Sequence, residues 1–211
     1  MFGKRETLLE IIKRLEKLYP SPKTELVYKT PFELLAATIL SAQATDASVN
    51  RATEKLFKKF KSVKDFAEAP LEDIDKMVSG INFYHNKAKN VKACASIIMD
   101  KHHGKVPDTM AALVELPGVA RKTANIVLSN IYGINEGIAV DTHVKRLSQR
   151  LGLTSQTDPV KIELDLMAIT PRESWSALSH MLILHGRRIC TARSPKHKEC
   201  VLFDICPSNN I

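Results

Sequence analysis

Apolar residues recur at helical spacing along nearly the whole chain. In segment after segment they stand three or four positions apart, which is typical of a helix with one buried face. Convincing strand alternation appears nowhere, and Pro- or Gly-containing breakers separate the runs, as at residues 20–22, 104–107 and 133–137. We therefore predict an all-α fold of about ten short helices. The clearest runs are Leu8, Ile11, Ile12 and Leu15; Val49, Ala52, Leu56 and Phe60; Val91, Ile97 and Ile98; Val144, Leu147 and Leu151; and Leu178, Met181 and Leu182.

The longest polar interruptions divide the chain into two helical domains. They fall at residues 19–24 and 133–137. They indicate a central block over residues 22–134 and a second domain in which residues 1–21 pack with residues 135–211.

The charge balance favours a polyanionic partner. The chain of 211 residues has 31 Lys and Arg against 23 Asp and Glu, a formal net charge of +8. Nucleic acid fits this excess, although an anionic membrane surface would attract the same charge. The apolar stretch Leu34–Leu40 is too short to span a bilayer, and residues 1–7 lack the apolar core of a signal peptide. We expect a soluble intracellular protein.

The cysteines cluster at one end of the sequence. Cys190, Cys200 and Cys206 lie close to the C-terminus, and only Cys94 stands apart. A secreted disulfide scaffold would spread its cysteines more evenly. Cys94 shares a predicted helical face with apolar neighbours, so we interpret it as a small core residue.

A very short connection joins two predicted helices at Leu116–Ala120. Helices over residues 108–115 and 121–132 would then form a helix-hairpin-helix. A Gly-containing turn that opens a helix presents backbone N–H groups and a positive helix end, which suit a phosphate. Such a contact grips a nucleic-acid backbone without reading bases. The alternative is an ordinary helix–helix turn.

Lys122 lies in the first turn of the second hairpin helix, where the helix dipole disfavours a cation. A lysine must be neutral to attack carbon, and desolvation beside a positive helix end favours the neutral amine. Lys122 is therefore a candidate nucleophile. The alternative is a lysine that contacts phosphate or water.

Asp141 ends the short apolar run 138–140 and precedes the helix marked by Val144, Leu147 and Leu151. This position predicts a helix N-cap, and capping alone would explain the residue. A carboxylate held there, facing a helix-start lysine, could also accept the amine proton and stabilise an oxocarbenium-like sugar.

Several of these motifs resemble the endonuclease III family, in the same order and at comparable spacing. The segments are Leu40–Asp46 (LSAQATD), Leu116–Asn125 (LPGVARKTAN), Val140–His143 (VDTH) and Leu184–Arg187 (LHGR). The resemblance covers essentially the whole chain. It implies a two-domain all-α fold, with a six-helix block that carries the hairpin and a terminal iron–sulfur domain, and with DNA bound between the domains.

The resemblance also implies an activity in base-excision DNA repair. Lys122 corresponds to the family's Schiff-base lysine and Asp141 to its catalytic aspartate. The implied enzyme is a bifunctional DNA glycosylase and AP lyase that removes oxidised pyrimidines such as thymine glycol and cuts the strand by β-elimination. Its partner would be double-stranded DNA with damaged pyrimidines or abasic sites. The target nucleotide must leave the base stack to be reached. A monomer in the cytoplasm, at the nucleoid, is expected.

The family match also suggests which residues touch DNA. Gln43 and Phe83 would fill the hole left by a flipped nucleotide. Without the family, Gln43 would be a helix-end polar residue and Phe83 a core aromatic; Phe83 also departs from the aliphatic residue expected there. Ala120 stands where the hairpin usually has a second glycine; a positive φ there would cost about 1 kcal/mol. The remaining predicted DNA contacts are Gly118, Ala120, Arg121, His143, Arg193 and Lys196.

The C-terminal cysteines nearly match the family's iron–sulfur pattern, which has four cysteines with gaps of six, two and five residues. Cys190, Cys200 and Cys206 fit, but His197 stands at the second position. We expect a four-iron four-sulfur cluster with His197 as an unusual fourth ligand, because imidazole is a legitimate iron ligand. Zinc or an incomplete cluster is the alternative, as is a His197 that is only a polar residue of a basic loop. The metal would be structural and would hold Arg193 and Lys196 towards DNA phosphates.

Three other functions compete with this interpretation. An adenine-mismatch glycosylase shares the hairpin, aspartate and cluster but lacks the lysine. A non-catalytic DNA-binding module would use only the hairpin and the basic surface. A zinc-binding regulator would use the Cys3His set structurally.

Overall fold

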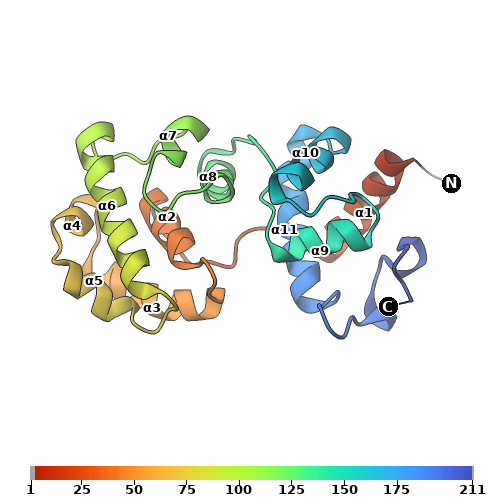
Figure 1. Cartoon of the computed structure of the whole chain (residues 1–211), viewed down its shortest axis with the longest axis horizontal. Helices are drawn as coiled ribbons and strands as arrows, with labels where there is room; N and C mark the ends of the chain where they lie inside the picture. Colours follow the sequence, from red (N-terminus) through yellow and green to blue (C-terminus); the bar gives the residue numbers. More distant parts are fainter. Residues whose placement is uncertain (1–2, 211) are drawn as a thin grey trace. The chain divides into compact units, whose positions relative to one another are not determined.

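The computed structural model, which describes residues 3–210, is built from helices (Figure 1). Over this range it contains eleven α-helices and no strand, which confirms the predicted all-α fold. None of the helices in the described residues is long and apolar enough to cross a membrane. The chain divides into two compact units, Glu25–Ile134 and a unit that joins Met1–Thr24 to Asn135–Ile211.

The unit Glu25–Ile134 is organised around α2 (Pro31–Leu40), in which nine of the ten residues are buried. α2 packs against α3 (Asp46–Lys59), α6 (Tyr84–His102) and α8 (Arg121–Val127), as Figure 1 shows. The remaining helices are α4 (Val63–Glu68), α5 (Leu71–Val78) and α7 (Met110–Val114), and α8 continues into a π-helix over Leu128–Tyr132. Cys94 of α6 is fully buried in this core, as its sequence context predicts.

The second unit is organised around α11 (Trp175–Arg188). This helix packs against α9 (Thr142–Arg150) and α1 (Lys4–Leu18), and α10 (Pro159–Ile169) contacts both α1 and α9. Short 3-10 helices lie before α11, at Arg172–Ser174, and after it, at His197–Glu199 and Phe203–Ile205. The apolar faces of these α-helices form a separate core.

Local sequence explains where most helices begin. Six helices start after a Thr, Ser or Asp whose side-chain oxygen accepts a backbone N–H of the first turn, and two of these have Pro in that turn. Both features stabilise a helix start. The capping residues are Thr30, Thr45, Ser62, Thr109, Asp141 and Asp158.

Candidate functional site

The connection between α7 and α8 is a tight hairpin that only glycine suits at position 118. Gly118 has a φ of +78°, and a Cβ atom there would lie 3.0 Å from both Cβ and Nδ2 of Asn90 on α6. Leu116 and Val119 on either side are buried, and the N–H of Val119 donates to the carbonyl of Leu116 at 3.1 Å. The turn is therefore fixed against α6 and is no mobile loop.

Ala120 ends the hairpin and is the N-cap of α8. Its φ of −90° and ψ of 168° are extended backbone, which any residue adopts. The free-energy cost that a positive φ at Ala120 would carry therefore does not arise. Ala120 has no side-chain group that could cap α8 by a hydrogen bond.

Lys122 is the second residue of α8, and its side chain is exposed. The helix start therefore lies where the sequence predicted it. The desolvation expected for Lys122 is therefore absent, and only its place at the start of a helix matches the expectation.

Asp141 is the N-cap of α9, as predicted. Its Oδ1 accepts the backbone N–H groups of His143 and Val144, each at 2.8 Å. These two bonds hold the carboxylate in one orientation. The negative charge of Asp141 also interacts electrostatically with His180, a buried residue of α11. Burial, followed by the charge of Arg187, lowers the pKa of His180 to about 4, and the Asp141 charge opposes that shift.

Gln43 and Phe83 lie at two loop tips that the structure brings together. Asn82 Nδ2 donates to the Gln43 backbone carbonyl at 3.5 Å, which ties the loop after α2 to the loop before α6. Gln43 is exposed, and Phe83 is 66% exposed, so the reading of Phe83 as a core aromatic is wrong. The φ angles of Gln43 and Phe83 are 52° and 57°, in the left-handed region that non-glycine residues rarely adopt. Such strain is concentrated at functional sites.

All four predicted cluster ligands line one small cavity of about 30 Å³ in the C-terminal loop. Burial is the main cause that raises the pKa of the Cys200 and Cys206 thiols, and the neighbouring Cys190 raises both further. The ring of His197 packs against Phe203, with 5.8 Å between ring centroids. Among the described residues, no three His, Cys, Asp or Glu side chains converge closely enough to hold a single metal ion.

The donor chemistry of this loop fits an iron–sulfur cluster. Thiolates are the usual cluster ligands, and imidazole replaces thiolate in some clusters. Metal binding would substitute for the protons that burial favours on these thiols.

Two arginines that the sequence analysis missed fasten the cysteine loop to α9. Arg146 donates to the backbone carbonyls of Gly186 and Cys190 at 2.8 and 2.9 Å. Arg150, one turn later, donates to Cys190 Sγ at 3.3 Å and to the Thr191 carbonyl at 2.8 Å. Their spacing of four residues on the helix that Asp141 caps was the available signal.

His185 was also missed, although it belongs to a motif of the family resemblance. It is 1% exposed; its Nε2 lies 3.4 Å from Cys200 Sγ and its Nδ1 lies 3.4 Å from the hydroxyl of Tyr19. If the tyrosine hydroxyl donates to Nδ1, the remaining proton sits on Nε2 and points at the sulfur. His185 is thus placed to donate a hydrogen bond to Cys200.

The other predicted DNA-contact residues differ in the exposure of their side chains and in the neighbours that these contact. Arg193 is exposed, and Lys196 is exposed but lies 3.6 Å from a carboxylate oxygen of Glu199. His143 is half-buried: its Nδ1 lies 3.2 Å from Arg146, and a Cβ atom on Gly186 would come within 3.0 Å of it. Burial lowers the pKa of His143. Arg121 begins α8 beside Lys122.

Lys122 and Asp141 lie in different units of the chain. Gln43, Phe83 and the hairpin share the unit of Lys122, whereas the cysteine loop shares the unit of Asp141. Each group is therefore built by its own core.

A helix-hairpin-helix in an all-α unit, together with a second helical unit that carries a C-terminal cysteine loop, is typical of a class of DNA-repair proteins, and the comparisons with known proteins agree. Residues 36–172 match the HhH-GPD superfamily of base excision DNA repair proteins. Residues 190–206 match the iron–sulfur binding domain of endonuclease III. The chain belongs to the HhH-GPD superfamily and, within it, to the endonuclease III family.

Individual relatives match over nearly their full length. Endonuclease III of Synechocystis sp. is 47% identical over 208 residues, which cover 99% of this chain and 95% of that protein. Endonuclease III of Bacillus subtilis is 45% identical over 92% of this chain and 88% of its own. A structure of a trapped endonuclease III–DNA covalent intermediate superposes with a TM-score of 0.92 at 40% identity, covering 99% of this chain and 98% of that one.

Proposed function

We propose that this protein is a bifunctional DNA glycosylase and AP lyase that removes oxidised pyrimidines from duplex DNA. One observation carries the proposal above the others. Lys122 stands at the start of α8, directly after the hairpin, in a chain 40% identical to an endonuclease III that has been trapped covalently on DNA. A non-catalytic DNA-binding module would need the hairpin but not this lysine.

The hairpin supplies the grip on DNA in this proposal. The backbone amides at the start of α8 and the adjoining basic side chains bind a backbone phosphate. Gln43 and Phe83, at adjacent loop tips, occupy the space that the flipped nucleotide leaves. Their exposure and strained backbone support this role.

The chemistry follows from an amine and a carboxylate that act on one sugar. The neutral amine of Lys122 attacks C1′ as the bond from C1′ to the base breaks, and the base leaves with the electron pair and takes up a proton. Asp141 accepts the proton that the amine loses and stabilises positive charge on the sugar. The sugar ring then opens: the nitrogen forms its second bond to C1′ as the C1′–O4′ bond breaks, and O4′ takes up a proton. The resulting imine acidifies C2′–H, and loss of that proton forms the C2′–C3′ double bond as the 3′ phosphate leaves by β-elimination.

The cysteine loop would hold a four-iron four-sulfur cluster through Cys190, His197, Cys200 and Cys206. When bound, the cluster supplies a structural cross-link. Arg146 and Arg150 would transmit that order to α9, and Arg193 would face phosphate on the outer side of the loop. We propose that the protein acts as a monomer on nucleoid DNA.

Metal analysis tests the ligand set. Anaerobically purified protein should be yellow-brown and contain iron and sulfide in equal amounts. Because neutral His replaces a thiolate, the cluster should bleach faster in air than in a His197→Cys variant. Stoichiometric zinc without sulfide would contradict the cluster, and bleaching unchanged by His197→Ala would remove His197 from the ligands.

Single-lesion duplexes test the activity. The protein should release thymine glycol and cut the strand 3′ to it, and should leave an undamaged duplex intact. Lys122→Ala should lose strand cutting, whereas Lys76→Ala, a change of an exposed lysine on α5 in the same unit, should retain it. Binding of the duplex without base release by the unaltered protein would reduce it to a DNA-binding module.

A further inference from the structure

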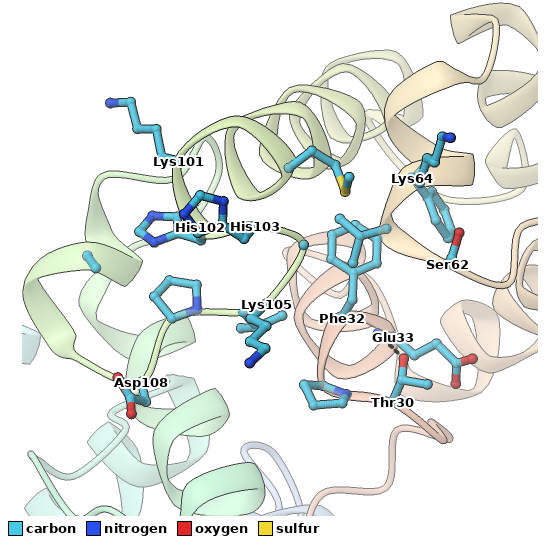
Figure 2. A pocket seen from close by; sticks show the side chains of 18 of the residues that line it. Thr30, Phe32, Glu33, Ser62, Lys64, Lys101, His102, His103, Lys105 and Asp108 are labelled. Atoms are coloured by element: carbon cyan, nitrogen blue, oxygen red, sulfur yellow. Dashed lines mark hydrogen bonds between the residues drawn. The ribbon is translucent and has the colours of Figure 1, made fainter.

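A pocket of about 920 Å³ lies within the unit Glu25–Ile134 (Figure 2). Its lining includes none of the predicted catalytic, DNA-contact or cluster residues. It is lined by the start of α2, the α3–α4 connection, the end of α6 and the loop that follows α6. Its volume is in the range of specific ligand sites. Apolar side chains form much of the wall. Val63 and Met99 are half-buried at its surface, and the buried core residues Phe32, Phe60, Phe66 and Val106 lie behind them.

The rim of this pocket is cationic. It carries Lys61, Lys64, Lys101 and Lys105, together with His102 and His103. Figure 2 shows Lys64, Lys101 and Lys105 spaced around the opening, with Phe32 between them. The four lysines are exposed, and the negative end of the α6 dipole accounts only for Lys101.

Acidic side chains only partly neutralise this rim. Asp65, which accepts the backbone N–H of Lys61 at 2.8 Å, lies beside one of the four lysines. Of the two acids that line the pocket, Glu33 is 8% exposed and accepts the backbone N–H of Lys29, while Asp108 is exposed. Lys64 lies 3.7 Å from Glu68 in an exposed pair. Across residues 3–210, Lys101 and Lys105 form no ion pair.

The turn that carries part of the rim is strained. His103 has a φ of 51°, and Gly104 follows with a φ of 77°. The described residues contain three non-glycine residues with positive φ, and the other two are Gln43 and Phe83. Backbone N–H groups of Gly104 and Lys105 donate to the carbonyls of Ile98 and His102, each at 3.0 Å, which holds the turn in place. Strain that the surrounding structure maintains is a reason to look for function there.

The pocket lies at the opposite ends of the helices that present Gln43 and Phe83. Thr30 caps the start of α2, whereas Gln43 follows its end; Phe83 caps the start of α6, whereas His103 follows its end. At 1.5 Å per residue, α2 spans about 15 Å and α6 about 28 Å. A ligand in the pocket therefore leaves both loop tips free.

We propose that this pocket docks a short acidic peptide segment of a partner protein. One large apolar side chain of the segment packs on the half-buried Val63 and Met99, and its carboxylates lie beside Lys101, Lys105 and Lys61. A nucleic-acid backbone would use the lysines but would leave the half-buried Val63 and Met99 without an apolar partner. Apolar anchors surrounded by charge complementarity are typical of peptide-binding surfaces.

Fluorescence anisotropy with the full-length protein tests the proposal. The probe is a fluorescein-labelled Asp-Asp-Glu-Asp-Leu-Phe peptide, and the control probe ends in Ser-Ser instead of Leu-Phe. We expect the affinity of the control probe to be lower by about tenfold or more, because the apolar anchor is lost. A Lys101→Glu, Lys105→Glu double variant should weaken binding of the first probe by about tenfold or more. The matched Lys55→Glu, Lys76→Glu variant, at exposed positions outside the pocket, should bind within about twofold of the unaltered protein.

An undamaged duplex is added as a competitor of the peptide in the same assay, because DNA is the other polyanion that this rim could bind. The duplex should not displace the peptide, and the Lys101→Glu, Lys105→Glu variant should cut a thymine glycol duplex as well as the unaltered protein does. No binding of the probe, equal binding of both probes, or displacement by the duplex would each overturn the proposal. The last result would assign the rim to nucleic acid instead.

Discussion

Asp141 has a structural and a proposed chemical task on one side chain, and the two can be separated. Its Oδ1 caps α9 through two hydrogen bonds, and its negative charge is what the proposed reaction requires. Asparagine keeps a capping oxygen but loses the charge.

Asp141→Asn should therefore leave the fold intact and remove most of the activity. We expect the free energy of unfolding to change by less than about 0.5 kcal/mol. The single-turnover rate of base release should fall about a hundredfold or more. Denaturant unfolding and single-turnover assays measure the two quantities, with Asp158→Asn, at the cap of α10, as the matched control. A fully active Asn variant would leave Asp141 as a helix cap only.

Gly118 combines a positive φ with close contact to Asn90, and Gly133 provides a control that has only the positive φ. A Cβ atom on Gly118 would lie 3.0 Å from Asn90, whereas nothing lies within 4 Å of one on Gly133. Gly133→Ala should cost about 1 kcal/mol of stability through its backbone. Gly118→Ala should cost about 1–3 kcal/mol more through crowding and should weaken duplex binding. Equal losses in thermal unfolding would mean that Asn90 moves aside easily.

At the scale of elements, the loops before α3 and α6 present Gln43 and Phe83 in strained conformations. Because Phe83 is 66% exposed, Phe83→Ala should change stability little, and Phe83→Gly should raise it by about 1 kcal/mol by relieving the positive φ. Both variants should lose more activity on a paired lesion than on an abasic site in a gapped duplex, whose stack opens more easily. Equal loss on the two substrates would mean that Phe83 does not act as a wedge.

Local elements were predictable where a local rule decides them. The Asp141 cap, the hairpin at 116–120 and the burial of Cys94 each follow from a few neighbouring residues, and the structure confirms them. The attachment of Arg150 to Cys190 joins residues 40 positions apart. The four-residue spacing of Arg146 and Arg150 indicates a shared helix face but not the partner of that face, which depends on how α9 and α11 pack.

Exposure was the property that sequence reasoning judged least well. Phe83 was expected in the core without the family match, because aromatic residues are usually buried. The positive φ of Gln43 and Phe83 was equally hidden, because neither residue type favours that conformation. The same holds for the basic-rimmed pocket, whose lining comes from four segments far apart in sequence.

At the scale of the whole molecule, the proposed function assigns DNA affinity to the net charge of +8 and the hairpin, and covalent chemistry to one lysine. These two properties should respond differently to substitution. Lys122→Ala removes one positive charge among 31 Lys and Arg residues, so duplex affinity should stay within a few fold. Loss of binding in that variant would show that Lys122 mainly contacts phosphate.

The most direct test of the account is to find which amine becomes bonded to DNA. The protein is incubated with a thymine glycol duplex in the presence of borohydride, which reduces the imine to a stable amine. The adduct is then digested, and its attachment site is mapped by mass spectrometry. The account predicts a nucleotide remnant on Lys122 and no adduct with Lys122→Ala. A remnant on any other amine, or trapping that persists in that variant, would contradict it.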